Sequence, residues 1–161
     1  MRKNFYKKPS ESIVVKTEVV CPNDSNPMGI LKGGRLVEWM DMAAAVCAQT
    51  HARRICVTAS VNQVDFHSPA KVGDMINIIA RITRSFNTSM EIFVQAFASK
   101  VPEEKKYIVS EAYFTFVALD ENGKTTGVIA VKPVTPSEKK QFHAALYRKK
   151  NRNRQIKKRL L

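Results

Sequence analysis

The sequence predicts an α+β fold in which a curved antiparallel β-sheet wraps around one central α-helix. The stretch 26–51 begins as a glycine-rich loop and continues as a helix of about 16 residues that is apolar nearly all round, as buried helices are. Four segments rich in β-branched and aromatic residues follow it, joined by short connections, which favours an antiparallel sheet. Such a sheet must cover its apolar face, and the alanine-rich helix is the suitable partner.

The remaining elements follow in chain order. Strands are expected at residues 12–21, 55–66, 75–83, 90–98 and 107–119. The first eleven residues are expected to be loosely held, and residues 124–135 to form a linker. A basic amphipathic helix is predicted from an N-cap at Ser137 to about Lys150, with fraying beyond it. The chain thus divides into a single domain over 1–135 and a basic C-terminal helical tail over 136–161.

The basic character of the chain is concentrated in its tail. The net charge is +13, and residues 136–161 contribute +9 of it through ten lysines and arginines against Glu138. The remaining residues carry only +4, so an acidic partner has to be considered separately for the tail and for the rest of the chain.

The cysteines and the N-terminus indicate a cytoplasmic protein. The three cysteines are odd in number and lack the spacing of metal ligands, which favours a reducing compartment. Cys47 and Cys56 lie among apolar residues and are expected in the core. Residues 1–12 are polar and basic, with no apolar segment of the kind that secretory signals contain.

One carboxylate, Asp41, is set into the apolar helix. Burying a charge is costly unless it has partners or a task. Asp41 could reach solvent or pair with Arg35 or Arg53. It could instead act as a general base or nucleophile at the edge of an apolar pocket. The residues alone leave these alternatives open.

The start of the same helix is unusual because it lacks a capping side chain. None of the residues 32–35 has the short side-chain oxygen that caps helices, so the leading N–H groups are free to bind a carbonyl oxygen that gains negative charge. A flexible hinge at Gly33 and Gly34 is the alternative. Asp41 lies about two turns further along, roughly 10 Å away. This separation favours a site that a neighbouring subunit completes.

Other polar residues carry weaker signals. Asn26 could form an Asx-turn ahead of Pro27 or hydrogen-bond a water or a carbonyl. His51 and His67 are expected to be structural or exposed, and His143 lies in the tail helix. The sequence contains no Ser/His/Asp arrangement, phosphate-binding glycine loop or metal-binding pair, so neither a metal nor a bound cofactor is expected.

Several short motifs occur together in one order. They are Asn26-Pro-Met-Gly29, Gly33-Gly34, Trp39-Met-Asp41, Val57-Thr-Ala-Ser-Val61, Val64-Asp-Phe66, Pro69 with Val72-Gly-Asp74, and Thr88-Ser-Met-Glu91. Together they resemble the hotdog-fold acyl-CoA thioesterases, specifically the cytosolic acyl-CoA hydrolase subfamily, over about residues 12–135. The basic tail is similar to that of bacterial members. Lys32 departs from the aromatic or aliphatic residue expected before the glycines, at the entrance for the acyl chain.

This resemblance implies hydrolysis of fatty acyl-CoA to free CoA and a carboxylic acid, with CoA as part of the substrate and no other cofactor. Asp41 would be the general base or nucleophile, and Asn26 of the facing subunit would position water or the thioester. The backbone N–H near Gly34 would polarise the carbonyl.

The resemblance also implies contacts with substrate and an assembly. Substrate or CoA would contact Gly33 and two short segments, whose residues are Val57, Thr58, Ala59, Asn87, Thr88 and Ser89. The active sites would lie at the interface of a homodimer, with dimers assembling further into a hexamer, a trimer of dimers. A cytoplasmic location, no specific nucleic-acid partner and no membrane span are expected.

Three alternatives to this interpretation assign the protein to another class of function. The same fold could bind or sense acyl-CoA without catalysis. The tail could associate with RNA or membranes, but a solvated basic end or an inter-subunit clamp is the favoured interpretation of its charge. A hotdog dehydratase is a weaker alternative because the central helix has no histidine before its end.

Overall fold

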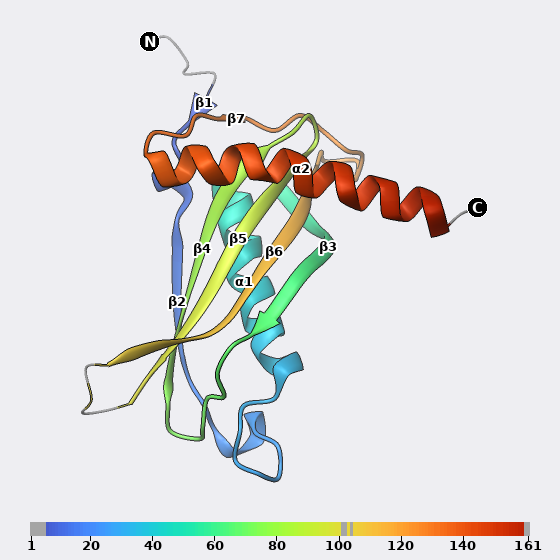
Figure 1. Cartoon of the computed structure of the whole chain (residues 1–161). Helices are drawn as coiled ribbons and strands as arrows, with labels where there is room; N and C mark the ends of the chain where they lie inside the picture. The colour runs from blue at the N-terminus through green and yellow to red at the C-terminus, as the bar shows by residue number, and fades with distance from the viewer. Residues whose placement is uncertain (1–5, 101–102, 104, 160–161) are drawn as a thin grey trace.

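The computed structural model describes residues 6–100, 103 and 105–159, and Figure 1 shows the course of the chain. The elements run in the order β1 (Tyr6–Lys7), η1 (Pro9–Ser12), β2 (Val14–Val19), η2 (Pro22–Asp24), α1 (Gly33–Ala52), β3 (Ile55–Phe66), β4 (Met75–Ser85), β5 (Ser89–Ser99), β6 (Lys106–Leu119), β7 (Ala130–Val131) and α2 (Pro136–Arg159). One strand, one central helix and four further long strands confirm the predicted α+β architecture.

Five strands form one antiparallel sheet in the order β2-β4-β5-β6-β3. The expectation that four consecutive strands follow one another through hairpin-length links is wrong at one link, because β3 pairs with β6 and not with β4. Residues 67–74 connect β3 to β4. Eight extended residues can span about 27 Å, whereas three strand spacings amount to about 14 Å. The link is therefore long enough to carry the chain across the sheet, and β3 becomes an edge strand.

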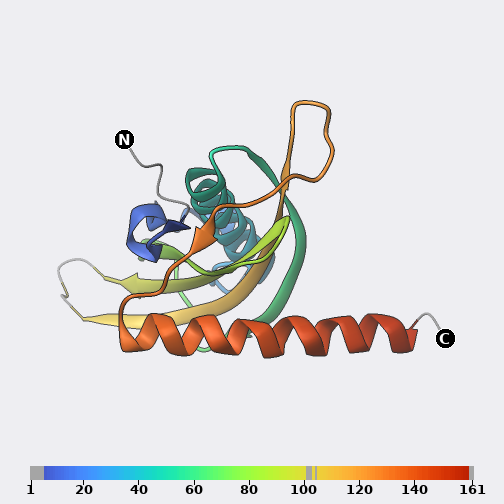
Figure 2. The same cartoon turned by 90° about the horizontal axis from the view of Figure 1, so that it is seen from above.

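Helix α1 fills the concave face of this sheet, and Figure 2 shows the strands curving around it. Its buried residues recur on one side, and small ones let the strands approach closely: Leu36, Trp39, Met40, Ala43, Ala44, Cys47, Ala48, His51 and Ala52. The opposite side differs from the prediction of a helix buried nearly all round, since Met42 and Val46 are 43% and 50% exposed. Within one chain, α1 therefore keeps an apolar stripe uncovered.

The segment before β2 is more ordered than predicted. Strand β1 pairs in parallel with β7, which lies inside the predicted linker. The Lys7 Nζ donates to the carbonyl oxygens of Thr50 and His51 at 2.8 and 2.9 Å, at the end of α1. These contacts attach residues 6–12 to the central helix, so the expectation of a loosely held segment is wrong for its described part.

Helix α2 begins earlier and ends later than predicted. Thr135 is the N-cap, not Ser137: its hydroxyl accepts from the Glu138 N–H at 3.2 Å, and the Glu138 carboxylate accepts from the Thr135 N–H at 2.9 Å. This is a capping box with Pro136 in the first helical position. The helix continues past Lys150 to Arg159. Lysine, arginine and glutamine favour helix, which accounts for the additional turns.

Helix α2 lies across the outer face of the sheet, opposite α1, and its C-terminal end extends past β3 (Figure 2). No helix in the described part of the chain is long and apolar enough to cross a membrane.

Candidate functional site

The first turn of α1 presents unpartnered backbone donors, as the sequence predicts. Lys32 is the N-cap and makes no capping hydrogen bond with its side chain. The first helical hydrogen bond runs from the Leu36 N–H to the Lys32 carbonyl at 3.0 Å. Within the described residues, the N–H groups of Gly33, Gly34 and Arg35 therefore have no acceptor. Donors aligned at a helix N-terminus favour a carbonyl or anionic oxygen.

An apolar cavity of about 370 Å³ adjoins this helix start. It is lined by Ile30, Leu31, Gly33, Leu36, Phe66, His67, Ser68, Pro69, Ala70 and Val109. A Cβ atom at Gly33 would lie 3.1 Å from Phe66 Cζ, so the glycine lets the ring approach the helix backbone. Phe66 belongs to one of the sequence motifs, but its place in this lining was not predicted, because only the sheet topology brings the end of β3 to the helix start.

Asp41 accepts a hydrogen bond from Thr58. The Thr58 Oγ1 donates to the Asp41 Oδ1 at 2.8 Å, from β3 to the third turn of α1. The carboxylate is half-buried and pairs with neither cation considered from the sequence. Arg35 instead donates to Asp24 at 2.8 Å and to Glu38 at 2.7 Å. Thr58 thus orients one carboxylate oxygen, and the other has no partner among the described residues.

The Arg35 pair shapes the charge at the helix start. Burial acts to raise the pKa of Asp24, but hydrogen bonds from the Cys21 N–H and from Arg35 hold that pKa below its ordinary value. The hydrogen bonds that Arg35 donates to Glu38 and to Asp24 raise the pKa of the Arg35 guanidinium. Arg35 is therefore matched by carboxylates and does not neutralise Asp41.

Asn26 forms the Asx-turn considered from the sequence. Its Oδ1 accepts from the N–H groups of Met28 and Ile30 at 3.0 and 3.1 Å. Its side-chain NH₂ group donates to no described residue of the same chain. No hydrogen bond joins Asn26 to Asp41, and eight residues of helix, about 12 Å, separate Gly33 from Asp41. Within one chain, the structure does not bring these predicted site residues together.

The two predicted CoA-contacting segments do come together. Val57 pairs with Val117, which pairs with Ser89 on its other side, so the two segments lie in one row of the sheet with only β6 between them. The carbonyl oxygens of Asn87 and Thr88 accept from Val128 and Ala118, which fixes the connection against β6 and the segment after it. Alternation along β3 directs Thr58 inward, toward Asp41, and Val57 outward.

Among the histidines and cysteines, His51 and Cys47 are buried and have structural surroundings. His51 is fully buried between the Ser12 hydroxyl at 3.1 Å and the Ile129 carbonyl at 2.9 Å. His67 lies 3.3 Å from Glu111. Burial raises the pKa of the Cys47 thiol to about 12, which keeps it protonated. No group of three or more His, Cys, Asp or Glu side chains that could hold a metal ion occurs among the described residues.

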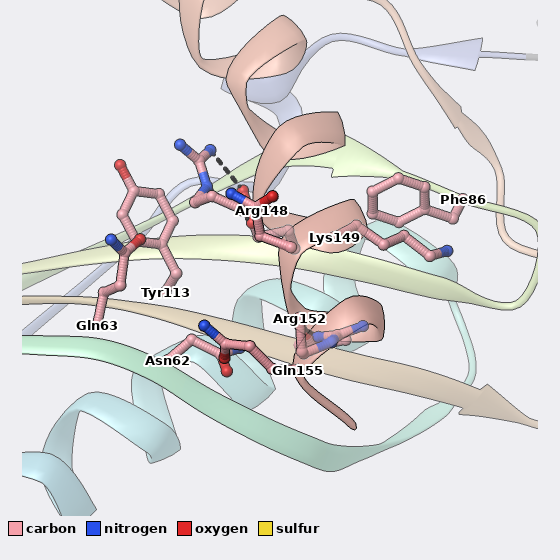
Figure 3. A pocket seen from close by; sticks show the side chains of 11 residues that line it. Asn62, Gln63, Phe86, Tyr113, Arg148, Lys149, Arg152 and Gln155 are labelled. Atoms are coloured by element: carbon pink, nitrogen blue, oxygen red, sulfur yellow. Dashed lines mark hydrogen bonds and ion pairs between the residues drawn. The ribbon is translucent and has the colours of Figure 1, made fainter. Parts of the chain in front are cut away.

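A second polar cluster, not identified from the sequence, lies between α2 and the outer face of the sheet (Figure 3). Arg148 donates twice to Glu91 of β5, at 3.0 and 2.7 Å, and Arg152 donates to Ser60 and Thr115 at 3.0 and 2.5 Å. The basic tail was visible in the sequence. Its docking on the sheet was not, because charged strand residues ordinarily face solvent.

Comparisons with known proteins agree with this architecture. The family model for the thioesterase superfamily matches residues 28–105. The uncharacterized acyl-CoA thioester hydrolase YkhA of Bacillus subtilis is 37% identical over 147 residues, which are 89% of this chain and 86% of that protein. Acyl-coenzyme A thioesterase 11 of Mus musculus is 36% identical over 91% of this chain, but the chain spans only 24% of that longer protein.

Solved structures extend the similarity to nearly the whole chain. The acyl-CoA hydrolase of Staphylococcus aureus in complex with butyryl coenzyme A, coenzyme A and coenzyme A disulfide superimposes with a TM-score of 0.89 at 36% identity, covering 96% of this chain and 95% of that one. An apo-hexameric acyl-CoA thioesterase superimposes with a TM-score of 0.91 at 34% identity, covering 94% and 97%. The chain therefore belongs to the thioesterase superfamily, among the thioester-hydrolysing enzymes with the hotdog fold of the acyl-CoA thioesterases.

Proposed function

We propose that this protein hydrolyses fatty acyl-CoA to free CoA and a carboxylic acid, with Asp41 as the reacting carboxylate. The observation that carries the proposal is the Thr58–Asp41 hydrogen bond of 2.8 Å, which holds a half-buried carboxylate in one orientation. Further support comes from the S. aureus hydrolase, solved with an asparagine, an aspartate and a threonine each replaced by alanine. Those positions are separated by 15 and 17 residues, as Asn26, Asp41 and Thr58 are.

The proposed chemistry needs no metal. As a general base, Asp41 takes a proton from water while the oxygen of that water adds to the thioester carbonyl carbon. The carbonyl oxygen then gains negative charge, which the N–H of Gly34 stabilises. The carbon–sulfur bond breaks, and the CoA sulfur leaves with the proton from Asp41. As a nucleophile, Asp41 would instead form an acyl-carboxylate anhydride that water opens in a second step.

The apolar cavity beside Gly33 and Phe66 is the proposed slot for the acyl chain. Its lining is largely aliphatic and aromatic, and its volume of about 370 Å³ falls within the range of ligand pockets. It adjoins the free N–H groups of α1, so an acyl chain in this cavity would place its carbonyl end near them.

A second copy of the chain would complete the site. The edge strand β3 is exposed along much of its length, and α1 exposes Met42 and Val46 beside it. Exposed apolar side chains next to an unpaired strand edge are suited to a partner. We propose a homodimer in which Asn26 of one copy faces Asp41 of the other, assembling further into a hexamer, as relatives named hexameric do. The relatives named cytosolic support the expected cytoplasmic location.

Substitution of Asp41 by asparagine tests the proposal. We expect Asp41→Asn to lower kcat by about 10²–10⁴-fold, because general acid–base catalysis contributes that much. Release of free CoA thiol from acyl-CoAs of several chain lengths would measure it. Glu121→Gln, on an exposed turn, is the matched control. Tight acyl-CoA binding by the wild-type protein without turnover would support the non-catalytic alternative and contradict the proposal.

Mixing two inactive variants tests the shared site. An Asp41→Asn chain and an Asn26→Ala chain would form a heterodimer with one intact site, so activity should return after mixing and reassembly. If no activity returned although heterodimers formed, Asn26 and Asp41 would not act across an interface. Hydrolysis in ¹⁸O-labelled water, with mass analysis of Asp41 after one turnover, distinguishes nucleophile from general base.

A further inference from the structure

The space between α2 and the outer face of the sheet is a cavity of about 190 Å³ (Figure 3). Its lining combines polar, cationic and aromatic side chains from α2 and three strands and the β4–β5 connection: Asn62, Gln63, Phe86, Glu91, Tyr113, Thr115, Arg148, Lys149, Asn151, Arg152 and Gln155. None of these residues belongs to the thioester site proposed above.

The charges around this cavity do not balance. Glu91 is the single carboxylate in the lining, and Arg148 and the Thr83 hydroxyl occupy its oxygens at distances of 2.6–3.0 Å. Lys149 and Arg152 have no ion-pair partner among the described residues. Arg84, which donates to the Phe142 carbonyl at 3.0 Å, lies near enough for its positive charge to repel that of Lys149. The cavity is therefore bordered by uncompensated positive charge.

The two unpaired cations are held in place without being neutralised. Arg152 uses only its Nη1 group, on the hydroxyls of Ser60 and Thr115, so its other N–H groups have no partner within the described residues. The Lys149 Nζ lies 3.7 Å from the centre of the Phe86 ring, toward which its side chain extends in Figure 3. Burial, followed by the charges of Arg152 and Arg84, lowers the pKa of Lys149. An anion would relieve this repulsion.

Phosphate is the anion that suits this arrangement. Arginine matches its oxygens through a planar fork, and lysine binds it as a point charge. The cavity is smaller than the range for whole drug-sized ligands, so it fits phosphate groups and not a complete cofactor.

The position of the cavity connects it to the substrate. Ser60 directly follows the predicted CoA-contacting segment 57–59, and Phe86 directly precedes 87–89. The two segments lie in one row of the sheet, on either side of β6. We infer that Lys149 and Arg152 form a phosphate-binding subsite under α2. Its ligand is a nucleotide phosphate, and, resting on the proposed function, the nucleotide end of CoA supplies it.

The test compares two thioester substrates. Acyl-CoA carries the nucleotide phosphates, whereas the matching acyl-pantetheine carries none. For a Lys149→Gln/Arg152→Gln variant we expect the KM for acyl-CoA to rise about tenfold with kcat nearly unchanged, and the KM for acyl-pantetheine to stay constant. Lys140→Gln, an exposed cation on the same helix, is the control. Arg152→Lys, which retains the charge, should raise the KM for acyl-CoA less than the double variant does.

A binding measurement keeps the inference independent of turnover. Adenosine 3′,5′-bisphosphate, the nucleotide end of CoA, should bind the wild-type protein and bind the double variant about tenfold more weakly. Selective binding of AMP or ADP that the variant loses, with an unchanged KM for acyl-CoA, would support the site with a free nucleotide as its ligand. Equal KM changes for both substrates, or unaltered nucleotide binding, would overturn the inference. Absence of hydrolysis in the wild-type protein would instead contradict the proposed function.

Discussion

The two faces of one sheet are covered by helices that are held in opposite ways. Helix α1 contacts the concave face through apolar side chains and small residues such as Ala43 and Ala44. Helix α2 contacts the outer face through Arg148 and Arg152 and through Phe142, and Ala145 is its one fully buried residue among those described. Apolar contact is non-directional, whereas the arginine contacts require particular acceptors.

This difference separates two tasks. The apolar side of the sheet provides the proposed slot for an acyl chain, against the helix that carries Asp41. The polar side keeps cations within reach of solvent, where they can attract phosphate. A CoA thioester has an apolar end and a highly charged end, so a sheet with one face of each kind suits both ends of such a substrate.

The largest expected effect on the stability of the fold comes from removing Arg148, the arginine that attaches α2 to the sheet. We expect Arg148→Met to lower the free energy of unfolding by about 3 kcal/mol, because it leaves the Glu91 carboxylate buried without its partner. Urea unfolding would measure it.

A double variant sharpens this test. Glu91→Gln combined with Arg148→Met should cost less than Arg148→Met alone, because no unpaired charge remains buried. Arg154→Met, on the exposed side of α2, is the control. A single variant as stable as this control would show that the ion pair does not hold α2 to the sheet.

The concave face should respond to volume and not to charge. We expect Ala44→Leu to cost about 1–3 kcal/mol, since the added atoms must displace strands that already touch the helix. Gln49→Leu introduces the same leucine side chain at an exposed position of α1 and should cost little. Thermal unfolding would compare the two. Tolerance of Ala44→Leu would mean that α1 is loosely packed.

The concave side could be predicted from the sequence because its signals are local. Apolar residues around Trp39 and Ala43, and the alternation at residues 75–83, follow the periods of helix and strand. The free helix start was predictable in the same way, from the absence of a capping side chain after Lys32. The edge position of β3 was not, since link length alone does not determine which strand a segment pairs with.

The outer face could not be predicted because its contacts join distant residues. Arg148 and Glu91 are 57 positions apart, and Arg152 and Ser60 are 92 apart. Nothing local distinguishes these arginines from their solvated neighbours in the tail. For the site, composition alone left the role of Asp41 open, and the motif resemblance brought Thr58 into consideration as a CoA contact. That Thr58 donates to Asp41 required the structure.

A smaller effect should come from His51, where the concave side meets the N-terminal segment. Burial lowers the pKa of His51, and the positive charge of Lys7 lowers it further. The hydrogen bond to the Ile129 carbonyl and the charge of Glu11 act to raise this pKa, but they only partly offset the lowering. The unfolded chain takes up this proton near pH 6.5, whereas the folded chain does so only at lower pH. Stability should therefore be greatest above pH 6.5 and decline as the pH falls toward the folded-state pKa. Thermal midpoints between pH 7.5 and 5.5 would measure the decline, which His51→Gln should flatten. An equal slope in both proteins would assign the acid sensitivity to other groups.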